Sequence, residues 1–149
     1  MQILIQRHAQ RLRRPGRKDG QLTAALGEAV GLIDGNGADL GSVTVIKNGK
    51  PSTLMELPPA SGNRYIAALV IYTARASFAY NLFDWAAHDL RQVQYESLGL
   101  APNPSLAYGT LSADRQVEAW VAFEIPEGVR DVWLDYQPGG SVIFSVKID

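Results

Sequence analysis

The chain has 149 residues, no cysteine, 46% hydrophobic residues and a formal net charge of −1. This length is sufficient for one domain with a core that needs no disulfide or metal. The absence of cysteine excludes disulfides, thiolate metal sites and cysteine nucleophiles. Residues 1–20 carry a net charge of +5 and residues 21–149 a net charge of −6, and such an acidic remainder is atypical of a nucleic-acid platform. We therefore expect no nucleic-acid partner.

Residues 1–20 are predicted to form a flexible basic arm, and residues 21–149 a single folded domain. The arm carries six basic residues and one acidic residue, with Pro15 and Gly16 as turn formers. Such a segment buries too little apolar surface to offset the entropy lost on ordering. The alternative is a contact with an anionic surface such as lipid headgroups. No apolar segment of the kind found in signal peptides follows Met1, so either the chain is not exported or its export signal lies upstream.

The sequence of the first half of the domain predicts strands joined by glycine-rich turns. Leu22–Ile33 is expected to be an edge strand, because glycines within it weaken a helix. A turn follows at 34–39, where Asp34, Asn36 and Asp39 could alternatively bind calcium, although their spacing is not that of an EF-hand loop.

Two further strands are predicted around a hairpin turn. Ser42–Lys47 is rich in β-branched residues, and the Asn48-Gly49 pair after it is typical of a two-residue turn with left-handed φ angles. A proline-containing loop at 57–63 leads to Arg64–Arg75. This segment is apolar on both faces, which indicates a central strand covered on both sides.

The middle of the chain is expected to alternate between aromatic-rich and loop segments. Phe78–Trp85 is predicted at a strand junction, Ala86–Asp89 as a turn, Leu90–Glu96 as a strand and Leu98–Ala107 as a long loop. The C-terminal part contains three alternating runs, Gln116–Pro126, Val129–Tyr136 and Ser141–Ile148.

These three runs are predicted to be consecutive antiparallel strands. Val117, Ala119, Val121, Phe123 and Ile125 would share one face of the first strand and enter the core. Short strands with Gly/Pro turns at this spacing are typical of an all-β fold. We expect an antiparallel Ig-like β-sandwich of about seven strands.

The segment Leu111–Gly128, Leu-Ser-Ala-Asp-Arg-Gln-Val-Glu-Ala-Trp-Val-Ala-Phe-Glu-Ile-Pro-Glu-Gly, resembles the signature of a bacterial Ig-like domain family of unknown function. That signature runs Leu-x-x-Gly-Glu, then Gly-Trp-Val-x-Phe-x-Val-Pro. The family is similar to a mycobacterial immunoprotective extracellular protein. The resemblance covers roughly residues 21–149 and departs at Ala119, at Asp114-Arg115 and at Ala74-Arg75.

The resemblance implies an exported or surface-anchored protein with no established enzymatic activity and no catalytic residues to carry over. The expected location is secreted or cell-surface. The expected function is a non-enzymatic interaction or accessory module that binds a protein or a glycan. A membrane contact would then require an upstream anchor or the basic arm, and the oligomeric state is left open.

The chemistry-bearing residues offer one alternative, a hydrolase site formed by Asp84, His88 and Asp89. A histidine in such a site must be oriented by an aspartate and reach a nucleophile, yet no Gly-x-Ser-x-Gly elbow presents a serine. Zinc needs three or four suitable ligands, and residues 21–149 contain one histidine and no cysteine. We therefore expect no metal and no cofactor. A further alternative is a structural subunit that assembles through exposed strand edges.

An aromatic patch is the predicted binding surface. If Gln116–Pro126 and Val129–Tyr136 form a hairpin, Trp120 and Trp133 lie as cross-strand neighbours on the outer face, and Ile143 extends it. The competing interpretation is that another segment covers these side chains, because large exposed apolar patches are uncommon on soluble monomers.

Overall fold

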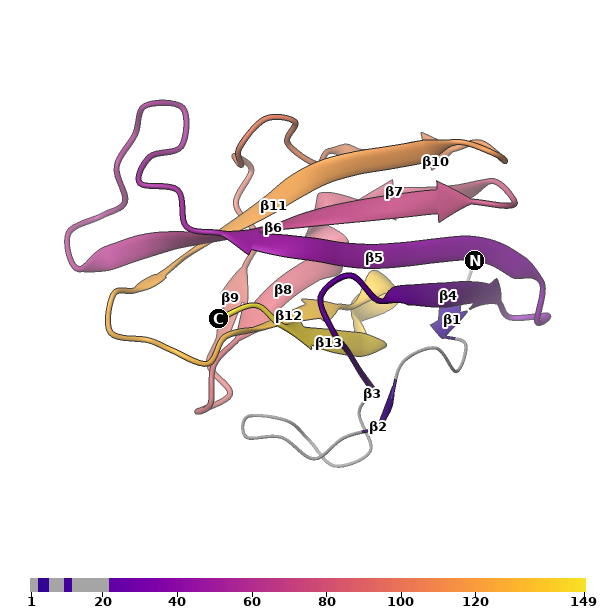
Figure 1. Cartoon of the computed structure of the whole chain (residues 1–149), viewed down its shortest axis with the longest axis horizontal. Helices are drawn as coiled ribbons and strands as arrows, with labels where there is room; N and C mark the ends of the chain where they lie inside the picture. Colours follow the sequence, from indigo (N-terminus) through magenta and orange to yellow (C-terminus); the bar gives the residue numbers. More distant parts are fainter. Residues whose placement is uncertain (1–2, 6–9, 12–21) are drawn as a thin grey trace.

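The computed structural model describes residues 3–5, 10–11 and 22–149, with side chains described from residue 22 onward. Two β-sheets lie face to face, with a two-stranded ribbon beside them (Figure 1). The predicted all-β class and the β-sandwich are therefore confirmed. The described residues form more and shorter strands than predicted. β3 and β13 pair in parallel, and the other pairs of labelled strands are antiparallel.

The first sheet contains the longest strands. Its order is β1 (Ile3–Ile5), β4 (Ala29–Asp34), β5 (Asp39–Gly49), β6 (Asn63–Ala74) and β11 (Gln116–Pro126). β6 lies between β5 and β11 and pairs with both over most of its length. The predicted central strand is thus confirmed.

The second sheet is built from shorter strands. Its order is β2 (Gln10–Arg11), β3 (Leu22–Ala24), β13 (Phe144–Lys147), β12 (Trp133–Tyr136), β8 (Trp85–His88) and β9 (Gln94–Glu96). The ribbon consists of β7 (Phe78–Asn81) and β10 (Tyr108–Leu111), and the 3-10 helices are η1 (Leu82–Asp84) and η2 (Pro138–Gly140). Because β1 and β2 lie within the predicted basic arm, part of that segment forms strands, and the arm's residues 1–2, 6–9 and 12–20 lie outside the described residues.

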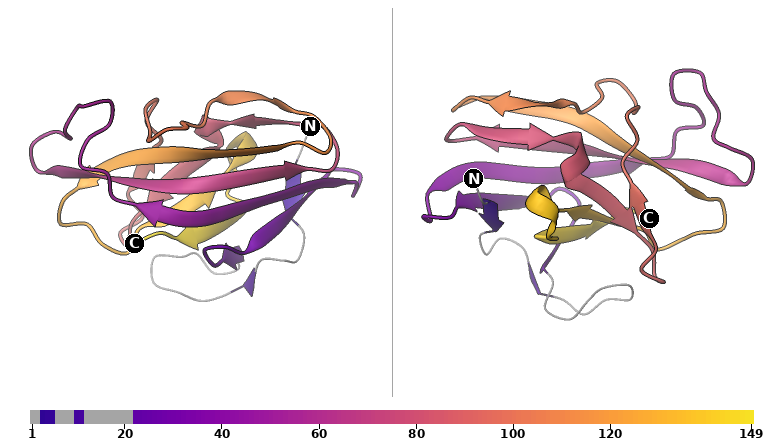
Figure 2. Two further views of the ribbon diagram at one scale, coloured as in Figure 1. Left: turned by 45° about the horizontal axis from the view of Figure 1, so that its top comes forward. Right: turned by 180° about the vertical axis from the view of Figure 1, so that it is seen from behind.

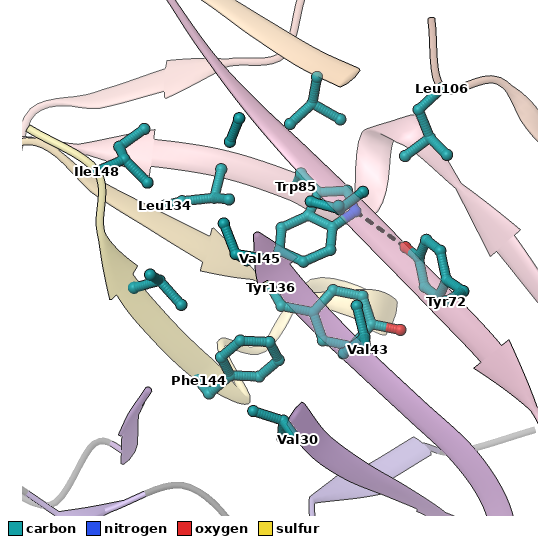
Figure 3. Close-up of a cluster of buried hydrophobic side chains, with 14 of the residues drawn as sticks. Val30, Val43, Val45, Tyr72, Trp85, Leu106, Leu134, Tyr136, Phe144 and Ile148 are labelled. Atoms are coloured by element: carbon teal, nitrogen blue, oxygen red, sulfur yellow. Dashed lines mark hydrogen bonds between the residues drawn. The ribbon is translucent and has the colours of Figure 1, made fainter. Parts of the chain in front are cut away.

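An aromatic cluster forms the centre of the core between the sheets (Figure 3). Trp85 and Tyr136 from the second sheet pack against Tyr72 of β6, and Phe144 packs against both of them. The ring centroids of Trp85 and Tyr136 are 4.7 Å apart. Trp85 Nε1 donates a hydrogen bond of 2.9 Å to the Tyr72 hydroxyl. Burial raises the pKa of both the Tyr72 and Tyr136 hydroxyls. Each such aromatic pair contributes about 0.5–1.5 kcal/mol beyond area burial.

The inner face of β11 is the one that the alternation predicts. Ala119, Val121, Phe123 and Ile125 are buried in the core, and Val117 packs at its edge. The pairing of β11 differs from the prediction, because β11 pairs with β6 in the first sheet, whereas β12 and β13 pair with each other in the second. The predicted hairpin between β11 and β12 is therefore wrong. The connection crosses from one sheet to the other, which strand alternation alone cannot reveal.

Two predicted turns are strand residues in the structure. Asn48 and Gly49 continue β5 and pair with Ala68 and Ala67 of β6, and the Asn48 side chain bonds to the backbone oxygen of Ile148. Ala86–His88 belongs to β8, so the turn lies four residues further on, between β8 and β9. Leu90 and Val93, predicted as packing residues, are each 43% exposed in that turn.

Candidate binding site

The predicted hydrolase residues do not converge. Asp84 lies in η1, and His88 ends β8 four residues later, which corresponds to about 13 Å along an extended chain. Asp84 is half-buried, and burial raises the pKa of its carboxyl group. The geometry therefore places this carboxyl group away from the imidazole with which it was expected to act.

The carboxylate of Asp89 accepts hydrogen bonds that hold the β8–β9 turn. Its Oδ1 accepts hydrogen bonds from the backbone of Arg91 (2.8 Å) and Val93 (3.1 Å), and its Oδ2 accepts one from the Tyr95 hydroxyl (2.9 Å). Burial alone would raise the pKa of Asp89, but these donors and the Arg91 charge bring it below its usual value. Asp89 thus holds a turn, as aspartates commonly do.

His88 is part of a buried polar cluster that the sequence did not reveal. His88 Nδ1 lies 2.7 Å from Asp135 Oδ2, and Ser145 Oγ donates a bond of 2.6 Å to Asp135 Oδ1. The three residues come from neighbouring strands of the second sheet, on the face opposite the core. The alternation of β12 and β13 places Asp135 and Ser145 on one face of the sheet and could have indicated this cluster. The prediction of a turn at Ala86–Asp89 left His88 outside the sheet.

The order of this cluster differs from that of a hydrolytic triad. A triad places histidine between serine and aspartate, so that the imidazole can take the serine proton. Here the carboxylate of Asp135 lies between the other two groups, and Ser145 has an exposed fraction of 0%. The arrangement satisfies buried polar groups, which stabilises the sheet, but it does not present a nucleophile.

The predicted aromatic patch is not assembled. Trp120 lies on β11 in the first sheet, whereas Trp133 lies on β12 in the second and is only 2% exposed, with its ring stacked on that of His88. Ile143 is half-buried and packs against the core. The pairing prediction is wrong because it depended on a β11–β12 hairpin. A binding role for these residues stays a prediction.

Trp120 is nevertheless at an informative position on the outer face of the first sheet. Lys47 Nζ lies 5.8 Å from the centre of the Trp120 rings, a distance at which a cation interacts with an aromatic face. The indole lies against Gly49: a Cβ atom on Gly49 would come within 3.1 Å of Trp120 Cζ3. The glycine therefore leaves room for the ring.

Two loops are fixed beside Trp120 by hydrogen bonds and by a small second core. The loop at 97–107 follows the edge of β11: Leu98 N donates to Ala122 O (2.8 Å), and Leu106 N donates to Trp120 O (2.8 Å). The loop at 50–62 contributes Leu54 to the cluster of Leu54, Tyr65, Ala67, Ala101 and Ala122, with Leu98 and Trp120 packed against it. Both loops rise above β6 and β11 in Figure 1.

The two loops expose large apolar side chains. Met55 is 73% exposed, Leu57 57% and Leu100 36%. We call these three residues the loop surface. Leu54 and Leu57 exchange two backbone hydrogen bonds of 2.9 Å, so the chain reverses tightly at Met55 and Glu56. Sequence patterns did not single out this surface, because its apolar residues are scattered among prolines and polar residues.

The turn at the tip of the first loop adopts a conformation that its residues disfavour. Met55 and Glu56 have φ angles of 48° and 65°, in the left-handed region that usually requires glycine or asparagine. Non-glycine residues in this region cost about 1–2 kcal/mol each. Strain of this kind concentrates at functional loops, and its observation therefore supports a functional hypothesis for the tip.

The described residues contain no group of three or more histidine, aspartate or glutamate side chains arranged to hold a metal ion. Asp34, one of the three residues considered for calcium, accepts backbone bonds from Asn36 N (2.8 Å) and Ala38 N (2.9 Å). Asp39 forms an ion pair with Arg75 at 2.9 Å. In the part of the chain that the structure describes, no helix is long and apolar enough to cross a membrane.

Comparison with known proteins gives structural relatives alone. No family model and no curated protein matches the sequence. Among solved structures, the secreted protein MPT63 of Mycobacterium tuberculosis is similar, with a TM-score of 0.68, 17% identity and coverage of 85% of this chain and 97% of that one. The chain has the fold of that secreted β-sandwich protein. The expected likeness to a mycobacterial extracellular protein is thus confirmed for the fold.

Two further structures share the fold. The YjhA protein of Bacillus subtilis aligns with a TM-score of 0.62 and 18% identity, over 85% of this chain and 100% of that one. An uncharacterised β-sandwich protein of Clostridium difficile aligns with a TM-score of 0.53 and 14% identity, over 89% and 99%. None of these three proteins carries the name of an enzyme. At such identities the likeness concerns the fold and does not transfer residue roles.

Proposed function

We propose that this protein is a non-catalytic binding module that acts outside the cytoplasm and recognises a protein partner through the loop surface. The observation that carries the proposal is the exposure of Met55, Leu57 and Leu100 on two chain-distant loops that are fixed to the same sheet. Large exposed apolar side chains on neighbouring loops mark candidate protein interaction sites. Loops on a rigid scaffold are where β-sandwich proteins commonly place such sites.

The fixed position of the loops favours binding. Leu54 and Ala101 belong to one buried cluster, so the two loops share a base on the sheet. The hydrogen bonds along β11 hold the second loop over its length. A surface held in place before binding loses less conformational entropy when a partner docks, and its affinity is correspondingly higher.

The chemistry of the surface indicates the kind of partner. Methionine is unbranched and polarisable, and therefore adapts to irregular apolar surfaces. Leu57 and Leu100 add branched aliphatic area, while the neighbouring Glu56 is an exposed acidic residue at the rim. A partner with an apolar depression and a basic residue at its edge fits this arrangement. The likeness to a secreted protein supports an extracytoplasmic setting.

Site-specific photo-crosslinking tests the proposal. A photoreactive amino acid is placed at Met55 or Leu100 in the full chain, and in a control variant at Arg75, whose side chain is 75% exposed at another part of the same sheet. Irradiation with the extracytoplasmic fraction of the producing cells should give one common adduct from positions 55 and 100. Unlabelled wild-type chain should compete for the adduct, and a Met55→Glu/Leu100→Glu variant should not.

The control position makes the result interpretable. If the same adducts form at Arg75 as at Met55, the labelling is non-specific and the loop surface is not the binding site. If neither loop position gives a competed adduct while both variants fold normally, the proposal is wrong.

A further inference from the structure

A cleft lies on the outer face of the second sheet, at β8 and β9. It has a volume of about 240 Å³ and is lined by Phe83, Ala86, Gln94, Glu96 and Gln137, with contributions from Trp85 and Ser97. Ala86 lies on β8 opposite Glu96 of β9 and opposite Asp135 of β12. Its short side chain leaves a hollow between the polar residues on either side. We call this hollow the Ala86 cleft.

We propose that the Ala86 cleft binds one ring of a neutral saccharide. Phe83 is 64% exposed, an unusual position for a phenylalanine, and it offers an aromatic face at the wall of the cleft. Aromatic faces pack against the apolar C–H face of a sugar ring, while planar polar side chains beside them bond its hydroxyl groups. Gln94, Gln137 and Glu96 supply such groups in the same cleft.

The two glutamines match a pair of neighbouring hydroxyl groups. Gln94 Nε2 donates a hydrogen bond of 3.2 Å to Gln137 Oε1, which fixes the two amides relative to each other. Gln94 Oε1 then remains as an acceptor and Gln137 Nε2 as a donor for a ligand. A hydroxyl group both donates and accepts, so sugar hydroxyls satisfy both amides. A guanidinium or ammonium group lacks an acceptor and would leave the Gln137 donors unused.

The described lining does not favour an anionic ligand. Among the described residues that line the cleft there is no lysine or arginine, and Glu96 contributes a carboxylate. A phosphate or carboxylate would therefore meet repulsion without a compensating cation. The volume of about 240 Å³ leaves room for a small ligand such as one sugar ring.

The walls of the cleft are fixed before any ligand arrives. Phe83 N donates to the Asn81 side chain at 2.9 Å, which caps η1. Gln137 N donates to Asp84 O at 2.6 Å, and this bond ties η2 to η1. Seen from behind, the two short helices lie next to each other (Figure 2). Gln94 and Glu96 are held by the pairing of β9 with β8. This preorganisation lowers the entropic cost of binding a small ligand.

The inference is tested by NMR titration of the ¹⁵N-labelled full chain with the methyl glycosides of glucose, galactose, mannose and N-acetylglucosamine. At least one glycoside should shift the side-chain amide signals of Gln94 and Gln137 saturably, with a dissociation constant on the order of millimolar. Phe83→Ala and Gln137→Ala should each weaken binding roughly three- to tenfold. Tyr108→Ala, a 76% exposed aromatic residue that does not line the cleft, should leave binding unchanged.

Three results would overturn the inference. The first is the absence of saturable shifts at these amides with all four glycosides at concentrations on the order of 100 mM. The second is binding that persists at full strength in Phe83→Ala. The third is saturable binding of arginine amide in place of the glycosides, which would identify the cleft as a site for a basic peptide side chain. The Met55→Glu/Leu100→Glu variant should retain the saccharide shifts, so failure of this inference is distinguishable from failure of the loop surface.

Discussion

The indole of Trp120 occupies the space in which a side chain on Gly49 would lie. A Cβ atom at Gly49 would come within 3.1 Å of Trp120 Cζ3 and 3.3 Å of Cη2, closer than ordinary van der Waals contact. Gly49 is in β5 and does not have a positive φ angle. The glycine is therefore explained by close packing, not by backbone conformation.

Gly49→Ala is expected to displace the Trp120 ring and to lower the free energy of unfolding by about 1–2 kcal/mol, because small-to-large changes at a packed contact force neighbours to shift. Chemical denaturation and the fluorescence emission of the tryptophans measure the two effects. Gly99→Ala is the matched control, since no heavy atom lies within 4 Å of a Cβ at Gly99. Equal stability of the two variants would show that the ring accommodates the methyl group.

The position of Gly49 also shows which features the sequence could predict. The apolar alternation of 116–126 correctly predicts the buried face of β11, since period-two burial depends on local geometry alone. The Asn48-Gly49 pair is typical of a turn, yet the turn lies at Met55 and Glu56. A glycine required by a distant side chain and a glycine required by a turn are identical in a sequence, so tertiary contacts decide between them.

The candidate sites depended even more on tertiary structure. Trp120 and Trp133 belong to alternating strands close in sequence, but the connection crosses between sheets and separates them. His88 joins Asp135 and Ser145 only through the pairing of β8 with β12, and 47 residues separate His88 from Asp135. Strand pairing at this separation leaves no local sequence signal, whereas the single-domain all-β class depends on composition and periodicity.

Asp135→Ala is expected to lower the free energy of unfolding by about 2–4 kcal/mol. The change removes the acceptor for Ser145 Oγ and the partner of His88 Nδ1 in a buried environment. Asp131→Asn is the control, because asparagine tolerates the left-handed φ of 57° at this position. The ion pair with Lys147 that it removes is about half exposed and is expected to contribute at most about 1 kcal/mol. Urea denaturation at neutral pH compares them. A loss no larger than that of the control would argue against a structural role for the cluster.

The lowered pKa of Asp89 predicts how the free energy of unfolding depends on pH. Its pKa is lower in the folded chain, so its charged form favours folding. The contribution is complete above the unfolded pKa of about 4 and is lost as the pH falls through the lower folded pKa. Asp89→Asn should therefore be less stable than wild type at about pH 6, and the difference should shrink towards about pH 2.

Thermal or urea denaturation across this pH range measures the Asp89 effect. Tyr95→Phe, which removes one donor to the same carboxylate, should reduce the pH-dependent part without abolishing it. A difference between wild type and Asp89→Asn that stays constant with pH would contradict the assignment of the lowered pKa to this turn.

Tyr72→Phe tests the polar contact within the aromatic core. The change leaves the buried Trp85 Nε1 without the acceptor it uses, and is expected to cost about 1–3 kcal/mol. Tyr95→Phe is a comparison in which the hydroxyl bonds to a turn and not to the core. If Tyr72→Phe leaves the free energy of unfolding unchanged, the hydrogen bond does not contribute to the net stability of the core.

The most direct test of the loop surface is an equilibrium affinity measurement with the partner captured by crosslinking. Met55→Glu and Leu57→Glu should each weaken binding at least about tenfold, because a charge replaces apolar contact area at the centre of an interface. Tyr108→Ala, which alters a comparably exposed residue at 76%, should bind as wild type does. Unchanged affinity in both loop variants, with their folds intact, would contradict the account that this β-sandwich binds its partner through Met55, Leu57 and Leu100.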